Sequence, residues 1–326
     1  MIQSERFYSA IKFTCVLLCV VFTMHVQASG IVTKVGRVKV EGNTAAIKSE
    51  TRAIEVTDYL GRSLSFSKPI ERVIALAPHI VENVYSAGAG ETLVGAVDYS
   101  DYPASAKDLV RVGTISSFSL EAIVSLKPDL VIVWHSGRGA NVLEKLEKIG
   151  IPTYASDPHS LLDVARSIRD YGALTGNADI AEASAKTFEL KYRSLAALHQ
   201  ESEAVSVLYE VWNQPLQTLN NKHIISDVIR LCGGVNLFGD EPSLAPVISV
   251  ESVLQRNPDV IIASGMGEEQ PEWLNDWYTW PQLKAVKNKN LYFISPDLLQ
   301  RHTARILDGA EIMCSQLDAA RLKLGL

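Results

Sequence analysis

The chain has 326 residues, of which 47% are hydrophobic and 21% are charged, and its formal net charge is −6. This composition is that of a folded globular protein, and the length is enough for two domains of ordinary size. The negative net charge argues against a nucleic-acid binder and against a polybasic membrane anchor. Only 7 histidines are present and they are scattered, so no metal-binding tract is visible.

The first 28 residues have the pattern of a secretory signal peptide. Arg6 and Lys12 supply positive charge, and the apolar run from Phe13 to Met24 is too short to span a bilayer comfortably. Small residues surround Ala28, after which we expect cleavage and export to the periplasm; an uncleaved anchor is the alternative. Residues 29–53 lack periodicity and are expected to form a flexible N-terminal arm.

From Ile54 onward, strands and helices alternate. A hairpin is expected over residues 54–66, followed by short strands at 72–77, 93–97, 130–134 and 153–155. The expected helices cover residues 79–87, 120–126, 141–149 and 161–174. Such alternation predicts a parallel sheet with helices on both faces, and we assign residues 54–176 to an N-terminal lobe.

A single long helix is expected over residues 177–201. Asn177 is a candidate N-cap, and Glu182 with Lys186 and Glu189 with Arg193 form i,i+4 pairs. The opposite face carries a helical repeat of mostly apolar residues: Ala181, Ala185, Phe188, Tyr192, Leu195 and His199. These features predict either a rigid linking helix or an ordinary long surface helix.

The alternation resumes in residues 202–326, which we assign to a C-terminal lobe. Strands are expected at 205–211, 260–263 and 291–294, and helices at 223–231, 249–255 and 305–322. A tryptophan-rich stretch at 272–280 is expected to be helical as well.

One sequence pattern occurs once in each lobe. A Ser-x-Glu opening, a short helix, a Pro-Asp pair and a buried strand follow one another around Glu121 and Asp129, and again around Glu251 and Asp259. The repetition predicts two similar lobes joined by one helix. We therefore expect an α/β fold with two Rossmann-like lobes, mostly parallel sheets and one long, rigid linking helix.

Two cysteines remain after the signal peptide. Cys15 and Cys19 leave with it, whereas Cys232 and Cys314 form an even pair in an oxidising compartment. This favours a disulfide, with two buried thiols as the alternative.

Candidate ligand-binding residues follow the predicted strands. Ligands of open α/β sheets bind at the carboxyl ends of the strands, and aromatic side chains facing each other across two lobes would form a flat-walled cleft. Such a cleft suits a large planar or apolar ligand, although core packing explains each aromatic taken singly. The candidates are Tyr99, Tyr102, Trp134, Trp212, Asp297 and Arg301.

Signals of catalysis are few. No Gly-x-Ser-x-Gly elbow and no Walker loop occurs in the sequence. Gly137-Arg-Gly139 follows a strand, opens a helix and has Asp157 about 20 residues further on, as in a dinucleotide-binding fingerprint. Val142 stands where the third glycine belongs, so the expectation is a protein that is not an enzyme. An exported α/β enzyme with a nucleotide site at Gly137–Gly139 is the alternative.

The doubled pattern, the signal peptide and the joining helix resemble the periplasmic solute-binding proteins with a rigid helical hinge. That family delivers cobalamin, siderophores, haem or some metals to ABC importers. The stretches that look closest to its vitamin B12-binding members are residues 97–103, 126–134 and 231–238, together with Asp297 and Arg301. The resemblance covers the chain from about Ile54 onward. It implies a protein that captures cobalamin between its lobes; a haem or ferric-siderophore binder of the same fold is the alternative.

The resemblance also implies roles for single residues. Tyr99, Trp134, Asp297 and Arg301 would line the corrin site with Trp212 as a companion, and Cys232 and Cys314 would match the family disulfide. Glu121 and Glu251 would be docking carboxylates that meet arginines of a permease dimer, which works with its ATPases; the alternative is that they are only helix-start residues. No cofactor is implied beyond cobalamin as transported ligand, and the protein is expected to be a monomer. Two cleft tryptophans of the enteric cobalamin binder fall on Ile115 and Ala245 here.

Overall fold

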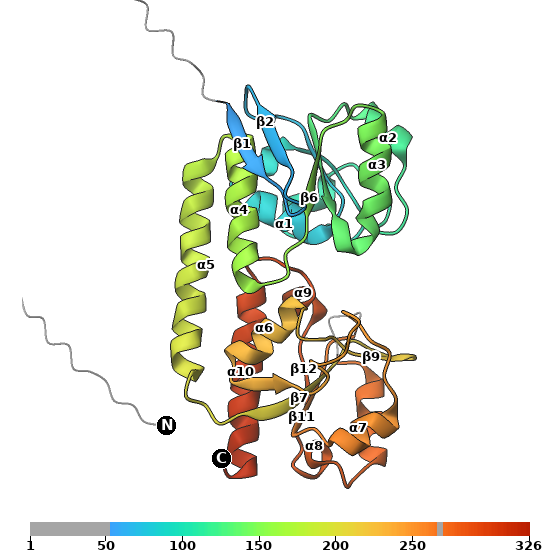
Figure 1. Cartoon of the computed structure of the whole chain (residues 1–326), viewed down its shortest axis with the longest axis vertical. Helices are drawn as coiled ribbons and strands as arrows, with labels where there is room; N and C mark the ends of the chain where they lie inside the picture. The colour runs from blue at the N-terminus through green and yellow to red at the C-terminus, as the bar shows by residue number, and fades with distance from the viewer. Residues whose placement is uncertain (1–52, 266–269) are drawn as a thin grey trace, which may run out of the picture. The chain divides into compact units, whose positions relative to one another are not determined.

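The computed structural model describes residues 53–265 and 270–326. All of them belong to one compact unit, Glu50–Leu326. The expected signal peptide, its cleavage point and residues 29–52 of the expected arm lie outside the described residues. The chain enters through an antiparallel hairpin of β1 (Ile54–Thr57) and β2 (Ser63–Phe66), with Gly61 at φ 77° in its turn (Figure 1). Glycine adopts this left-handed conformation without a steric penalty.

The N-terminal half, from β1 to α4, is built on a four-stranded parallel sheet. Its strands are β3 (Val73–Ala75), β4 (Leu93–Ala96), β5 (Leu130–Trp134) and β6 (Thr153–Ser156), in the order β4-β3-β5-β6. Alternate side chains of the strands pack on α1 (Pro78–Ser86) and α4 (Leu161–Thr175). The others pack toward α2 (Leu120–Ser125) and α3 (Ala140–Lys148). The sheet is therefore covered on both faces, as the alternation predicts.

The C-terminal half, from β7 to α10, repeats this plan. Its parallel sheet has the order β10-β7-β11-β12 and contains β7 (Val205–Glu210), β10 (Gly234–Asn236), β11 (Val260–Ala263) and β12 (Leu291–Phe293). One face packs on α6 (Ile224–Leu231) and α10 (Ile306–Leu324). The other packs on α7 (Val250–Arg256), the 3₁₀ segment η4 (Glu272–Thr279) and α8 (Lys284–Lys287).

Apart from short 3₁₀ and π segments, four short elements were not expected from the sequence. They are the hairpin of β8 (Trp212–Asn213) and β9 (Leu216–Gln217), strand β10, helix α8 and helix α9 (Pro296–Leu299). Each has 4 residues or fewer. That is too short for a helical or strand periodicity to show.

Helix α5 (Ala178–His199) runs beside α4 and along α10 (Figure 1). Of the predicted face, Ala181, Ala185, Phe188 and Leu195 are buried, and the pairs Glu182–Lys186 (3.4 Å) and Glu189–Arg193 (4.0 Å) form on the other side. Lys191 contacts Asp308 at 2.6 Å, which ties α5 to α10.

The expected cap at Asn177 is wrong. Its backbone is not extended (φ −104°, ψ 31°), and its side chain makes no capping hydrogen bond. Instead the Asn177 amide donates back to the Thr175 carbonyl at 3.2 Å, because Gly176 has already turned the chain in the left-handed conformation.

The repeated sequence pattern has a structural counterpart. Asp129 accepts the backbone N–H of Arg72 at 2.9 Å, just before the central strand β3. Asp259 accepts the backbone N–H of Ser206 at 3.0 Å in the central strand β7. Each Pro-Asp pair is thus tied to the start of a central strand of its own sheet by the same kind of hydrogen bond, once in each half.

The predicted disulfide between Cys232 and Cys314 is confirmed, with a Cα–Cα distance of 4.6 Å. Cys232 follows the last residue of α6 and Cys314 lies within α10, so the bond joins the two helices on one face of the C-terminal sheet. Within the described ranges, no helix combines the length and apolar character needed to cross a membrane.

Candidate functional site

A buried carboxylate joins the two halves. Glu82, in the middle of α1, has only 3% of its surface exposed, and it faces two arginines of the C-terminal half. Arg301 donates to it at 3.0 Å, and Arg305 donates two hydrogen bonds at 2.7 and 2.9 Å. A charge this deep is compensated by such bidentate pairing.

Arg301 connects further acidic residues. It contacts Asp101 at 2.7 Å and Asp297, four residues earlier in the chain, at 2.9 Å. Burial alone would lower the pKa of Arg301, but its hydrogen bonds to Asp101 and Glu82 outweigh this and raise the pKa. The arginine therefore stays charged at the centre of three carboxylates.

Next to the ionic cluster lies a group of aromatic rings. Trp134, at the end of β5, packs edge-on against His79 (centroids 5.1 Å apart) and His302 (5.9 Å), and His223 packs against His302 (5.5 Å). Asn83 donates to the His302 carbonyl at 2.9 Å, a second buried link between the halves.

The histidines of this group are neutral. Burial lowers the pKa of His79 to about 4 and that of His223 to about 4, and burial with the neighbouring histidines lowers the pKa of His302 as well. Nε2 of His79, Nδ1 of His302 and Nε1 of Trp134 are buried without a hydrogen-bond partner within the described part of the chain. The group thus offers free polar atoms beside a large aromatic ring.

The loop after β4 supplies the tyrosines. Tyr99 is 78% exposed and has φ 63°, whereas the Tyr102 ring lies under the Arg305 guanidinium at 3.9 Å. Arg111 donates to the Ser100 carbonyl at 2.9 Å and holds the loop in place. An exposed aromatic ring on an anchored loop is available for stacking on a ligand.

Four of the ligand-binding residues predicted from the sequence lie close to one another at the junction of the two halves. Tyr102, Trp134, Asp297 and Arg301 lie around the ionic and aromatic groups. Trp212 belongs to the β8–β9 hairpin, where its Nε1 donates to the Gln214 carbonyl at 2.9 Å.

Sequence reasoning missed several residues of this junction. Glu82, Asn83 and Asp101 were not singled out, nor were His79 and His302. The usable signal was a charged residue between the apolar Val81 and Val84 of α1, because such a residue needs a partner when it is buried.

Ile115 and Ala245 occupy the positions at which the resemblance led us to expect two cleft tryptophans. Both are partly buried and pack against the hydrophobic cores. The aromatic surface at the junction rests instead on Trp134 and the tyrosines of the loop after β4.

The glycines at 137 and 139 have a packing role. A Cβ at Gly137 would lie 2.1 Å from the Trp134 ring, and a Cβ at Gly139 would lie 2.2 Å from the Trp134 carbonyl oxygen. Only glycine allows the chain to pass this close to the tryptophan. Their spacing is thus explained by Trp134 without a nucleotide.

The two predicted docking carboxylates occupy equivalent places. Glu121 and Glu251 are both exposed in the first turn of α2 and α7, and Ser119 and Ser249 cap these helices through hydrogen bonds of 3.1 and 3.2 Å. Hydrogen bonds to its own backbone N–H and to Ser249 lower the pKa of Glu251. The arrangement presents negative charge once in each half.

Within residues 53–265 and 270–326, no group of three or more histidine, cysteine or acidic side chains is arranged to hold a metal ion.

Comparison with known proteins places the chain in one family. The family of periplasmic binding proteins matches over residues 73–298. A vitamin B12-binding protein of Vibrio cholerae serotype O1 is 35% identical over 254 residues, which cover 78% of this chain and 91% of that protein. A vitamin B12-binding protein of Pectobacterium carotovorum is 34% identical, covering 76% and 89%.

Solved structures agree. The crystal structure of the periplasmic vitamin B12-binding protein of Vibrio cholerae has a TM-score of 0.72 and 34% identity, covering 78% of this chain and 98% of that one. A periplasmic haem-binding protein of Roseiflexus sp. RS-1 has a TM-score of 0.68 at 23% identity, covering 77% and 99%, which shows the shared fold alone. The chain belongs to the periplasmic binding protein family.

Proposed function

We propose that this protein is a periplasmic solute-binding protein that captures cobalamin in a cleft between its two lobes and delivers it to an ABC importer. The observation that carries the proposal is the similarity to vitamin B12-binding proteins, at 35% identity across 91% of one such protein. The exposed and half-buried aromatic rings at the junction of the halves support it, since a corrin ring offers a large, flat surface for stacking.

In this proposal, Tyr99, Tyr102 and Trp134 present ring surface to the corrinoid, with Trp212 as a companion across the cleft. Asp297 and Arg301 supply the polar contacts. Arg301 already satisfies three carboxylates, so a ligand amide would have to replace part of that network. The exposed Tyr99 can be reached by a ligand without displacing an ion pair.

The proposed partner is the permease dimer of the importer with its ATPases. Glu121 and Glu251 would dock on it, one from each lobe, because exposed carboxylates across an interface fix register and accelerate encounter. We further propose lobes at 54–176 and 202–326 with a linking helix at 177–201, a monomer, and a signal peptide that is cleaved after about Ala28. The protein would act by binding, without catalysis or a cofactor of its own.

The alternatives are a haem or siderophore binder of the same fold and an exported enzyme using Gly137–Gly139. Absorbance difference spectra of the purified protein with cyanocobalamin, haemin and NADH separate them. A shift with cyanocobalamin alone supports the proposal. A shift with haemin alone supports a haem binder of the same fold. A shift with NADH supports the exported enzyme.

A further inference from the structure

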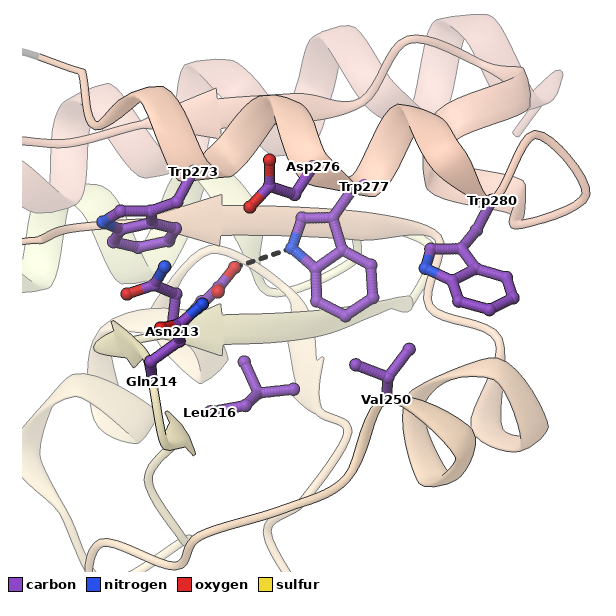
Figure 2. A pocket seen from close by; sticks show the side chains of 9 residues that line it. Asn213, Gln214, Leu216, Val250, Trp273, Asp276, Trp277 and Trp280 are labelled. Atoms are coloured by element: carbon purple, nitrogen blue, oxygen red, sulfur yellow. Dashed lines mark hydrogen bonds between the residues drawn. The ribbon is translucent and has the colours of Figure 1, made fainter.

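A pocket lies within the C-terminal half, beside the β8–β9 hairpin that also carries Trp212. It has a volume of about 180 Å³ and lies between η4, the β8–β9 hairpin and the start of α7 (Figure 2). Three indole rings from η4 and the residue after it, Trp273, Trp277 and Trp280, point into it. The remaining walls are Glu210, Asn213, Gln214, Leu216, Val250 and Asp276.

The pocket contains two negative side chains and no positive one among its described lining residues. Glu210, the last residue of β7, is 2% exposed, and its Oε2 accepts the Trp277 Nε1–H at 2.7 Å. Its second oxygen makes no hydrogen bond within the described part of the chain. Asp276 stands at the exposed rim, so the pocket has an acidic side chain both at its floor and at its mouth.

An uncompensated carboxylate this deep needs a reason. An ordinary core position would pair it with a basic side chain or replace it with an apolar one, because a lone buried charge is costly. Here the neighbours are indole faces, which attract cations through the negative charge of their π-systems. Aromatic walls with a carboxylate are the arrangement by which proteins hold alkylammonium groups.

We propose that this pocket binds a small alkylammonium cation, with the head group among the three indoles and its charge balanced by Glu210 and Asp276. The volume suits a trimethylammonium-sized head group rather than a corrinoid. Because the pocket includes none of the proposed cobalamin-binding residues, the proposal does not depend on the identity of the transported ligand.

Proton linkage gives the proposal a second signature. Burial, with a smaller contribution from Asp276, raises the pKa of Glu210 to about 7, although the bond from Trp277 opposes the rise. A bound cation favours the ionised carboxylate, so binding releases a proton and tightens as the pH rises from 6 to 8.

The test is a titration of the full-length mature protein with choline, followed by tryptophan fluorescence and calorimetry. Choline is expected to bind at one site, whereas its neutral carbon isostere 3,3-dimethylbutan-1-ol is expected to bind at least tenfold more weakly. Glu210→Gln, which keeps an acceptor for Trp277, should weaken choline binding about tenfold and abolish its pH dependence. The matched control Glu272→Gln lies exposed on the same segment outside the pocket and should bind like the wild type.

Two further titrations ask which kind of cation the pocket prefers and whether it is separate from the cobalamin site. N-acetylargininamide replaces choline to ask whether the pocket prefers a protein side chain, and tighter binding of it than of choline would overturn the proposal. Protein saturated with cyanocobalamin should bind choline as well as free protein. Equal binding of choline and its neutral isostere, an unchanged affinity in Glu210→Gln, or competition with cyanocobalamin would each contradict the proposal.

Discussion

Glu82 and Arg305 form a bidentate ion pair between α1 and the residue before α10, with oxygen–nitrogen distances of 2.7 and 2.9 Å. The pair joins the N-terminal half to the C-terminal half at a position where Glu82 is almost completely buried. The Arg305 guanidinium also covers the Tyr102 ring at 3.9 Å. One arginine thus holds both a buried carboxylate and a candidate ligand-binding aromatic.

Removing the charge of Glu82 should destabilise the protein. Glu82→Gln leaves Arg301 and Arg305 side by side without their shared carboxylate, and breaking a buried pair in this way costs on the order of 3–5 kcal/mol. Urea unfolding should show that loss as a lower midpoint with an unchanged slope. The control Glu91→Gln alters an exposed glutamate in the same half and should change stability by less than about 0.5 kcal/mol. Equal midpoints for the two variants would show that the ion pair adds no stability.

The histidine group should make stability fall in acid. The pKa of His79 is lowered to about 4 from a normal value of 6.5, so between these pH values the unfolded chain binds more protons than the folded one. The stabilising contribution is complete above about pH 6.5 and is lost as the pH falls toward 4, at roughly 1 kcal/mol per pH unit. Glu210 acts in the opposite sense, since its raised pKa of about 7 makes the folded state bind the extra proton.

His79→Gln isolates the histidine contribution, because Glu210 is present in both proteins. The stability difference between pH 7 and pH 4.5, measured by urea unfolding, should be smaller in this variant than in the wild type. His159→Gln is the matched control, since the His159 side chain is 51% exposed and contacts Asp157 at the surface. A pH profile that His79→Gln leaves unchanged would show that His79 is not a source of acid sensitivity.

Loss of the disulfide should loosen the C-terminal half. The bond closes a loop with a sequence separation of 82, for which the chain-entropy model gives on the order of 4 kcal/mol of stabilisation, often less in practice. Cys232→Ala combined with Cys314→Ala should lower the unfolding midpoint accordingly. Protein exported to the periplasm and alkylated without reduction should carry no label on either cysteine, and two labelled thiols would contradict the bond.

The docking carboxylates should matter for transport and not for stability. Glu121→Ala with Glu251→Ala removes one exposed charge from each half, at a cost of a few tenths of a kcal/mol per helix start. Ligand affinity and melting temperature should stay nearly unchanged, while transport in a reconstituted importer falls sharply. The double variant Glu91→Ala with Glu272→Ala, which also removes one exposed glutamate from each half, is the control. Normal transport by the Glu121→Ala, Glu251→Ala variant would show that both residues act only as charges at helix starts and do not dock the permease.

Tyr99 should contribute to corrinoid affinity without supporting the fold. It is 78% exposed, so Tyr99→Ala removes stacking surface and no core packing, and a loss of roughly 1–3 kcal/mol in binding is expected. Trp134 is different: its ring contacts His79, His302 and Gly137, so Trp134→Ala should lower stability as well as affinity. Tyr278→Ala, an exposed tyrosine on η4, is the control for Tyr99. Equal affinities for the Tyr99 variant and this control would place the ligand elsewhere.

Much of the fold was predictable because its signals are local. The strand at Leu130–Trp134 and the strand at Val260–Ala263 are bounded by Pro-Asp pairs and contain apolar runs, and both occur at the predicted residues. The long helix was evident from its periodicity. Pairing across the halves was not predictable, since Glu82 and Arg305 are 223 residues apart and neither has a local motif.

The candidate site was predictable only as a class of residues. Aromatic side chains after strands pointed to the loop of Tyr99 and Tyr102 and to Trp134. The histidines at 79 and 302 carry no such signal, because isolated histidines are common and their grouping depends on how the two halves meet. The three tryptophans of the pocket beside η4 stand close together in the sequence and could be recognised there as a cluster. The burial of Glu210 beside them could not be predicted.

The most direct test of the account is a calorimetric titration of the mature protein with cyanocobalamin, with haemin titrated in parallel under the same conditions. We expect cyanocobalamin to bind with a stoichiometry of one per chain and haemin to bind far more weakly or not at all. Saturable haemin binding without cyanocobalamin binding would contradict the account and assign the protein to the haem binders of its fold.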